Sequence, residues 1–207
     1  MNILRISCSP QGVEGESHKL SDAIVRYLLE RGGSTVTLVE RLIGVDPIPH
    51  IGADYANIVQ LSAEEIQGNA LARLSEALIG EVERADAIVI ATPMHNLGVP
   101  SVLKAWIDHV VRAGRTFDVS AEGKKGRLGD RPVFVAIASG GRFSGAHARQ
   151  PDFLTPYLKA VLGTIGLTNI TFFSIQGTGL GSTAVENARR MAAHDIQVHF
   201  APDYLDA

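Results

Sequence analysis

The sequence has little cysteine and no long hydrophobic run. Cys8 is the one cysteine among 207 residues, which excludes an internal disulfide framework and is typical of a reducing compartment. No segment approaches the roughly 18 consecutive apolar residues of a membrane span, and the N-terminal residues lack the pattern of a secretory signal. We therefore expect a cytoplasmic protein that neither crosses nor binds a membrane.

An excess of charge is also missing. The formal net charge is -3, so the composition gives no reason to expect nucleic acid or acidic lipid as a partner. The seven histidines show no metal-ligand spacing, and we expect no metal site.

Two familiar phosphate-binding signatures are absent. There is no G-x-x-x-x-G-K-[ST] segment, which excludes a P-loop nucleotide hydrolase. A resident dinucleotide would favour G-x-G-x-x-G after the first strand, whereas Gly12 and Gly15 supply only G-x-x-G. Glu40 matches the expected ribose-binding acid only in residue type and at a loose spacing.

What is present is a regular alternation of strand-like and helix-like segments. The composition is 45% hydrophobic, enough for a sizeable core in one domain spanning residues 1–207. Apolar and β-branched runs predict five strands, at 3–8, 34–40, 87–91, 132–138 and 169–174. Helical spacing of apolar residues predicts five helices, marked by 20–28, 66–82, 103–111, 153–162 and 185–196. This alternation predicts an α/β fold with a doubly wound five-stranded parallel sheet in the order 2-1-3-4-5, covered by helices on both faces.

Two segments lie outside the alternation. Residues 44–62 contain Pro47, Pro49 and Gly52 and are expected to form a long irregular loop. Residues 115–131 are rich in glycine and lysine and are expected to form a loop that projects from the body of the protein.

Three loops follow the first, third and fourth predicted strands, which meet at the switch point of such a sheet. After the first strand, Ser9 and Ser17 can offer hydroxyl groups to an anion, with Ser17 placed as the helix N-cap. The loop after the third strand, 91–100, is rich in proline, glycine and asparagine. In the loop after the fourth strand, Gly140 and Gly141 allow the backbone to approach a ligand closely. A phosphate at the first loop and a planar ring between the other two fit flavin mononucleotide, FMN.

Several motifs resemble one family. The segment 93–97 (Pro-Met-His-Asn-Leu) with 103–104 (Leu-Lys) resembles the flavin loop of the FMN-dependent NADH-azoreductase family. Segments 112–117, 155–158 and 163–166 are also similar, in the same order along the chain. The resemblance implies a flavodoxin-like fold, a homodimer, one non-covalent FMN per chain, NADH or NADPH as electron donor, and quinones or aromatic azo compounds as acceptors.

The resemblance also implies a set of cofactor-binding residues, and no obligatory catalytic side chain because the flavin carries the chemistry. It assigns Ser9, Gly15, Glu16 and Ser17 to the phosphate, Met94, His95, Asn96 and Leu97 to the isoalloxazine, and Ala138, Ser139, Gly140 and Gly141 to its far edge. We interpret Phe117 and Phe143, in loops beside the ring, as either walls of the substrate pocket with His95 or plain packing.

The chain departs from the family pattern at three of these positions. Gly15 stands where serine is usual and His95 where tyrosine is common, and Ser139 replaces an arginine, with Arg142 just beyond the two glycines. These departures bear on substrate range and flavin potential.

The sequence thus predicts an FMN-dependent NAD(P)H oxidoreductase that reduces quinones and cleaves azo compounds by a ping-pong mechanism. Two alternatives remain open at this point. One is a flavodoxin-like electron carrier or flavin-binding regulatory module without turnover of its own, although a carrier is expected to be more acidic than -3. The other is a free-flavin reductase, from which flavin dissociates during turnover.

Overall fold

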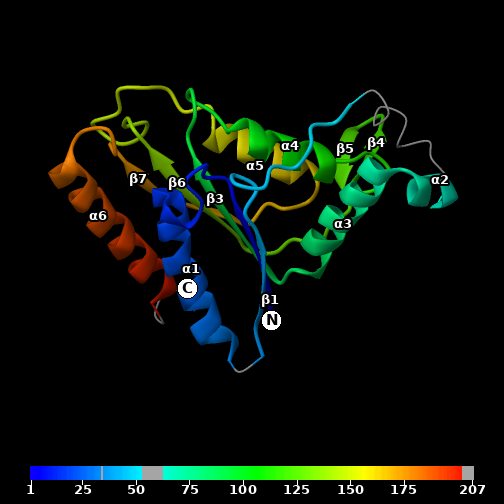
Figure 1. Cartoon of the computed structure of the whole chain (residues 1–207), viewed down its shortest axis with the longest axis horizontal. Helices are drawn as coiled ribbons and strands as arrows, with labels where there is room; N and C mark the ends of the chain where they lie inside the picture. The colour runs from blue at the N-terminus through cyan, green and yellow to red at the C-terminus, as the bar shows by residue number, and fades with distance from the viewer. Residues whose placement is uncertain (34, 53–62, 202–207) are drawn as a thin grey trace.

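The central sheet consists of five parallel strands (Figure 1). The computed structural model describes residues 1–33, 35–52 and 63–201. The strands of the sheet are β1 (Asn2–Ser7), β2 (Thr37–Arg41), β3 (Ala87–Pro93), β6 (Val133–Ser139) and β7 (Ile170–Gln176). The helices are η1 (Gly12–Glu14), α1 (Glu16–Gly32), α2 (Ala63–Gly68), α3 (Ala70–Arg84), α4 (Ser101–Val110), α5 (Thr155–Thr164) and α6 (Ser182–Phe200).

The strand order is β2-β1-β3-β6-β7, and every neighbouring pair in this sheet is parallel. Counted along the chain within this sheet, the order is 2-1-3-4-5, which confirms the predicted doubly wound topology. The two strands nearest the centre, β3 and β6, are buried along almost their whole length, as continuous apolar runs of a parallel sheet require.

Helices cover both faces of the sheet (Figure 1). Alternate residues of each strand face opposite sides, so neighbours such as Ile3 and Leu4 belong to two separate cores. One core contains Leu4 with apolar residues of α3, α4 and α5, and the other contains Ile3 with residues of α1 and α6. Packing in these two cores therefore fixes α1, which follows β1, and α4, which follows β3, relative to the carboxyl edge of the sheet.

The second predicted helix is divided in two. The spacing of apolar residues predicts one helix over 66–82, but α2 ends at Gly68 and α3 starts at Ala70. Asn69 separates them as an N-cap, because its side-chain oxygen accepts a 3.0 Å hydrogen bond from the Ala72 N–H. The prediction of a continuous helix was therefore wrong at this position.

The segment 115–131 is not simply a loop, because it contains an antiparallel hairpin of β4 (Phe117–Ser120) and β5 (Gly123–Gly126). The hairpin lies near α3, at the opposite end of the molecule from β7 and α6 (Figure 1). It packs closely on the turn after α5, since a Cβ on Gly126 would overlap the backbone of Gly166. The side chain of Arg127 also donates to Asp118 at 2.9 Å across the two strands. These contacts correct the prediction of an irregular projecting loop.

The other segment expected to be irregular, 44–62, is described only as far as residue 52, where it contains no helix or strand. Residues 53–62 lie outside the described part of the chain, as does residue 34 of the predicted second strand.

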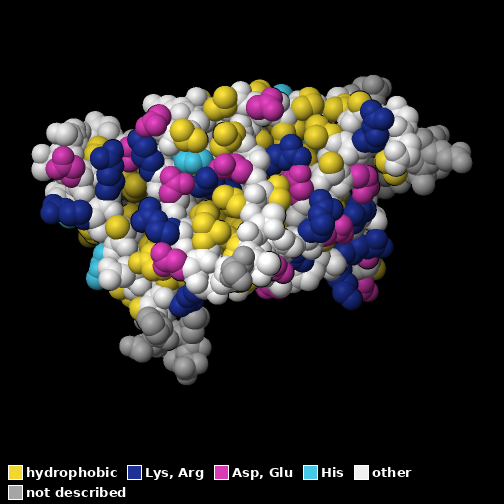
Figure 2. All heavy atoms as spheres, turned by 60° about the horizontal axis from the view of Figure 1, so that its bottom comes forward, with side chains coloured by type: hydrophobic (Ala, Val, Ile, Leu, Met, Phe, Trp, Pro, Cys, Tyr) yellow, Lys and Arg dark blue, Asp and Glu magenta, His cyan; other side chains and the backbone are white. Residues whose placement is uncertain are grey.

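On the face shown in Figure 2, lysine and arginine side chains alternate with aspartate and glutamate rather than forming a patch of one sign. In the described ranges, no helix is both long and apolar enough to span a membrane.

Candidate functional site

Three loops meet at the carboxyl edge of the sheet, where the chain leaves the neighbouring strands β1 and β3 toward opposite edges of the sheet. The Cys8 N–H donates to the Ala91 carbonyl at 2.8 Å, and the Met94 N–H donates to the Ala138 carbonyl at 2.8 Å. The loops after β1, β3 and β6 are therefore held side by side, as the topological switch point of an open α/β sheet requires.

The first loop wraps around Ser9 and leads into α1. The Gln11 N–H donates to Ser9 Oγ at 3.2 Å, and the Gly12 N–H donates to the Ser9 carbonyl at 3.0 Å. Gly15 comes so close to Ser9 that a Cβ on it would overlap the serine side chain. The close approach of Ser9 therefore requires glycine at position 15, where the family pattern has serine.

Residues 43–45 support the same loop from outside. The Gly44 N–H donates to the Ser7 carbonyl at 3.1 Å, and a Cβ on Gly44 would overlap the backbone of Cys8 and Ser9. The backbone of the loop is therefore enclosed by a segment that sequence reasoning did not connect with it.

Ser17 was predicted as the N-cap of the first helix, and this is wrong. The cap is Gly15, in an extended conformation, and Ser17 lies in the first turn of α1. Its side chain is buried, and its Oγ has no hydrogen-bond partner among the residues that the structure describes. A buried hydroxyl without an internal partner, close to the N–H groups of a helix N-terminus, is the arrangement expected of an anion-binding site.

Glu16 has a different partner. Its carboxylate accepts two hydrogen bonds from Arg189 of α6, at 2.8 and 2.5 Å. The hydrogen bonds from Arg189 lower the pKa of Glu16 although partial burial opposes this, so Glu16 is ionised and paired. Only its backbone remains available to an anion.

A network of charges lies beneath the first loop. Buried Arg5 of β1 forms ion pairs with Asp22 of α1 and Glu40 of β2, so Glu40 is engaged and does not serve as a ribose-binding acid. Next to it, Nδ1 of the buried His18 lies 2.9 Å from Ser7 Oγ. Burial lowers the pKa of His18, and the Arg5 charge lowers it further.

The loop after β3 makes a tight turn. His95 and Gly98 exchange two backbone hydrogen bonds of 3.1 and 3.0 Å, and the residues between them have positive φ, 48° at Asn96 and 72° at Leu97. This is the geometry of a two-residue type I′ turn. For leucine the left-handed conformation costs roughly 1–2 kcal/mol, and strain of this kind is concentrated at binding sites.

The loop after β6 forms the opposite wall. A cavity of about 490 Å³ lies between Met94, Asn96 and Leu97 on one side and Ser139, Gly140 and Gly141 on the other. A Cβ added to Gly140 would meet no atom, so this backbone is open to a ligand. His95 is exposed at the edge of the turn, while Ala138 is buried behind Ser139.

Gln150 also lines this cavity, and sequence reasoning missed it. Its Nε2 donates to Ser139 Oγ at 3.2 Å and contacts Met94 Sδ at 3.1 Å, so it joins the two walls. Gln150 lies in an irregular segment, and no local pattern marks it as a site residue.

Neither predicted aromatic residue lines the cavity. Phe117, expected in a loop beside the ring, lies in β4 and is buried in the core at the hairpin. Phe143 does follow β6 in a loop, but its ring is buried in the same core and its N–H donates to Gln176 at 2.8 Å. Within this chain the structure favours the packing interpretation for both.

Cys8 is fully buried, and burial raises the pKa of its thiol far above the ordinary value, so it is a core residue rather than a reactive thiol. Over residues 1–33, 35–52 and 63–201 no cluster of His, Cys, Asp and Glu could hold a metal ion.

The sheet order and the paired loops at its switch point define a protein of the flavodoxin-like class. The sequence matches the Flavodoxin_2 family, described as a flavodoxin-like fold, over residues 1–200. Several relatives are FMN-dependent NADH:quinone oxidoreductases. Enzyme 4 of Pseudomonas fluorescens is 47% identical over 89% of this chain and 88% of its own length. Enzyme 5 of Burkholderia lata is 42% identical over 93% of each chain.

Solved structures show the same fold. An azoreductase from Bacillus anthracis superposes with a TM-score of 0.82 at 24% identity, covering 97% of this chain and 98% of the other. An FMN-dependent NADH-azoreductase from the same species, in complex with FMN, has a TM-score of 0.77 at 22% identity, covering 97% and 99%. This chain belongs to the flavodoxin-like family of FMN-dependent NADH:quinone oxidoreductases, which confirms the resemblance seen in the sequence.

Proposed function

We propose that this protein is an FMN-dependent oxidoreductase that uses NADH to reduce quinones and aromatic azo compounds. The observation that supports this most directly is the buried Ser17 hydroxyl at the start of α1, which has no partner among the described residues. The related FMN-dependent NADH:quinone oxidoreductases support the choice of cofactor, donor and acceptor.

The residues fit FMN. We assign the phosphate to the Ser17 and Ser9 hydroxyls with the backbone N–H groups of Glu16 and Ser17, because Gly15 keeps this loop open and the Glu16 carboxylate is paired with Arg189. The isoalloxazine would lie against Met94, Asn96 and Leu97, with Gly140 and Gly141 at its far edge. His95, exposed beside the turn, would border the acceptor.

The protein's own contribution is binding and orientation. When bound, FMN supplies the two-electron chemistry: it takes a hydride from NADH and passes the two electrons, with protons from solvent, to a quinone that becomes the hydroquinone. The N–H groups of Asn96 and Leu97 donate to no group in the described part of the chain, and both residues line the cavity. Gly140 and Gly141 line the other side of the cavity, where their backbone N–H groups would stabilise negative charge on a bound ring.

A ping-pong mechanism follows if donor and acceptor use the same exposed face of the ring. Parallel lines in double-reciprocal plots with NADH and menadione are then expected, whereas intersecting lines would show that both substrates bind together.

With an azo dye, two NADH should be consumed per bond cleaved, because forming two amines from one azo group takes four electrons.

The test is direct. The purified protein should show the absorption of bound flavin, and should oxidise NADH when menadione is added. Bound FMN without NADH oxidation would indicate an electron carrier or regulatory module. Flavin that leaves the protein during turnover, seen as recovery of free-flavin fluorescence, would indicate a free-flavin reductase.

We also propose a two-fold dimer in which the partner completes each site. Apolar side chains are exposed at two places that support this: Val119 on the hairpin is 70% exposed, and Phe153 is 62% exposed next to Leu97, to whose carbonyl its N–H donates at 3.1 Å. An isologous pairing would cover both. Light scattering should give twice the chain mass, and a fully active monomer would contradict the proposal.

A cytoplasmic location is proposed as well, supported by the lone cysteine, which has no second cysteine for an internal disulfide.

A further inference from the structure

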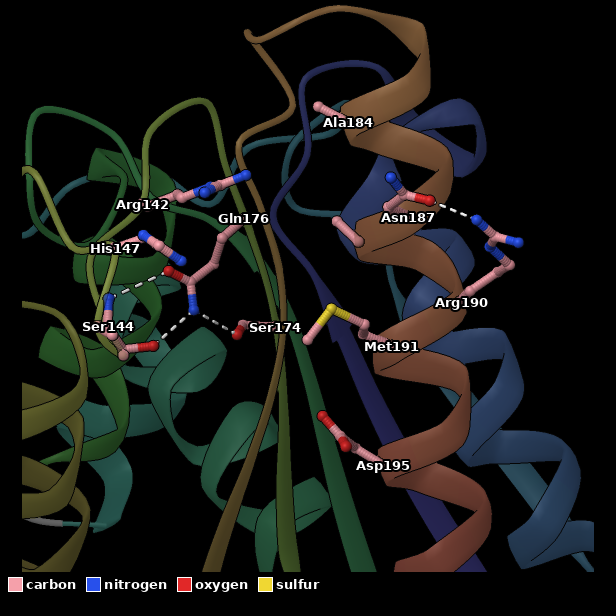
Figure 3. Close-up of a pocket in the computed structure, with 13 residues that line it drawn as sticks. Arg142, Ser144, His147, Ser174, Gln176, Ala184, Asn187, Arg190, Met191 and Asp195 are labelled. Carbon is pink, nitrogen blue, oxygen red and sulfur yellow. Dashed lines mark hydrogen bonds between the residues drawn. The ribbon is translucent and has the colours of Figure 1, made fainter.

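A second and larger cavity lies on the far side of the loop after β6. It has a volume of about 870 Å³ and is bounded by that loop, by the end of β7 and by one face of α6 (Figure 3). Its size is within the range of cavities that hold small organic ligands. Nothing in the function proposed so far uses it.

The two cavities share one strip of backbone. Gly140 and Gly141 line the smaller cavity, and the next residue, Arg142, lines the larger one. The strip is fixed to the turn after β7, because the Gly179 N–H donates to the Gly140 carbonyl at 3.1 Å and the Gly177 N–H to the Gly141 carbonyl at 3.2 Å. A ligand that begins at the ring site and extends past Gly141 therefore arrives at Arg142.

The Arg142 side chain is suited to bind an anion in this cavity. Its side chain extends toward the cavity in Figure 3, and among the described residues no carboxylate pairs with it. Its loop is held by Gln176, whose Oε1 accepts from the N–H groups of Phe143 (2.8 Å) and Ser144 (3.1 Å). The Gln176 Nε2 in turn donates to Ser144 Oγ at 2.6 Å and to Ser174 Oγ at 3.0 Å. A guanidinium on a fixed loop matches a phosphate with two parallel donors.

The α6 wall is apolar along its middle and acidic at its far end. Ala184 and Ala188 face the cavity with Met191, which is 69% exposed, and Asp195 follows one turn further on. From residue 184 to residue 195 the helix rises about 16 Å, at about 1.5 Å per residue. Arg190 also lines the cavity, and its guanidinium donates to Asn187 rather than to Asp195 (Figure 3).

We propose that this cavity binds the adenosine diphosphate half of NADH, with Arg142 on the diphosphate, Met191 and Ala188 against the adenine, and Asp195 on the ribose hydroxyls. The inference rests on the proposed function for the nicotinamide end of the molecule. A carboxylate that accepts from the ribose 2′-hydroxyl repels a 2′-phosphate, as acidic residues do in other NAD sites. Asp195 therefore favours NADH over NADPH.

The first experiment separates the two halves of the donor. In Arg142→Ala, KM for NADH should rise at least tenfold, while KM for reduced nicotinamide riboside, which lacks the whole adenosine diphosphate half, stays unchanged. Arg149→Ala removes an exposed arginine of the same loop outside the cavity and should leave both values unchanged. An equal change for both donors, or no change for NADH, would overturn the proposal.

A binding measurement makes the result independent of turnover. ADP-ribose titrated by calorimetry into the FMN-loaded protein should bind the wild type and the Arg149→Ala variant, and bind Arg142→Ala at least tenfold more weakly. Equal binding to all three would refute the cavity as the site. If the wild type bound ADP-ribose but oxidised no NADH, the proposed function would fail while this inference survived.

The acid is tested by donor choice. Asp195→Asn should raise the ratio of kcat/KM for NADPH to that for NADH at least fivefold, whereas Glu186→Gln, an acid on the same helix outside the cavity, should not. An unchanged ratio in Asp195→Asn would remove Asp195 from the site.

Discussion

Arg189 of α6 donates two hydrogen bonds to Glu16, from Nε at 2.8 Å and from Nη2 at 2.5 Å, and so joins the middle of α6 to the first residue of α1. The pair neutralises a carboxylate that would otherwise stand next to the proposed phosphate site. It also fixes α6, which forms one wall of the larger cavity, to α1, which begins at the phosphate loop.

The first prediction concerns this pair. Arg189→Ala leaves the Glu16 carboxylate uncompensated, so FMN should bind about two- to fivefold more weakly at low salt, as befits a half-exposed ion pair. The double variant Glu16→Gln/Arg189→Ala should recover wild-type affinity, measured by quenching of FMN fluorescence. If the double variant binds as weakly as Arg189→Ala, the effect is not electrostatic.

Ser17→Ala removes the one buried hydroxyl of the phosphate loop that has no internal partner in the described residues. FMN binding should weaken by roughly 1–3 kcal/mol, the value of a hydrogen bond to a charged group. Thermal stability of the protein without FMN should not fall, because no internal hydrogen bond is lost. Ser120→Ala on the hairpin serves as the control, and equal FMN affinity in the two variants would contradict the assignment.

Gly15→Ala should disrupt the same loop by steric overlap. The new methyl group meets the side chain of Ser9, so FMN affinity is expected to fall at least about tenfold, which corresponds to roughly 1.4 kcal/mol. Removing the obstructing side chain in Gly15→Ala/Ser9→Gly relieves the overlap but also deletes the Ser9 hydroxyl, so part of the affinity should return. A single variant that binds FMN normally would show that the loop has room there.

Asp130 predicts an acid-sensitive contribution to stability. Hydrogen bonds from the Thr168 hydroxyl and N–H, followed by smaller contributions, lower the pKa of Asp130 to about 2 from an ordinary value of 3.8. Since the folded-state pKa is below the unfolded one, this stabilisation is complete above about pH 4 and is lost as the pH falls toward 2.

The measurement is urea unfolding of the wild type and Asp130→Asn across this range. The difference in unfolding free energy should be constant near neutral pH and vanish near pH 2. Thr168→Val, which removes the hydroxyl donor, should reduce the pH-dependent part. A difference that persists unchanged at pH 2 would exclude ionised Asp130 as its origin.

Much of the fold could be predicted because its strands carry their own signal. β3 and β6 are buried on both faces and appear in the sequence as continuous apolar runs, and β1 was placed within one residue at each end. The hairpin of β4 and β5 could not be found in this way. Each of its strands has four residues, and β5 is only glycine and lysine, so packing against the turn after α5 determines it rather than local preference.

The site was predictable where it depends on position along the chain, and not where it depends on tertiary contacts. The loops at the ends of β1, β3 and β6 follow from topology alone. Ser17 was misplaced as a cap because the extended backbone of Gly15 starts α1 earlier. The partner of Glu16 lies 173 residues away, and Gln150 reaches Ser139 from an irregular segment, so neither contact has a counterpart in local sequence.

Gly44 gives the phosphate loop a dependence that extends beyond its own residues. The loop's backbone rests on a glycine more than thirty positions later in the chain, one that makes no ligand contact in the proposed site. Transplanting residues 8–17 alone into another sheet would therefore transfer the ligand-binding groups without the surface that shapes them. An engineered version of this site must carry the turn at 43–45 as a second, separate graft.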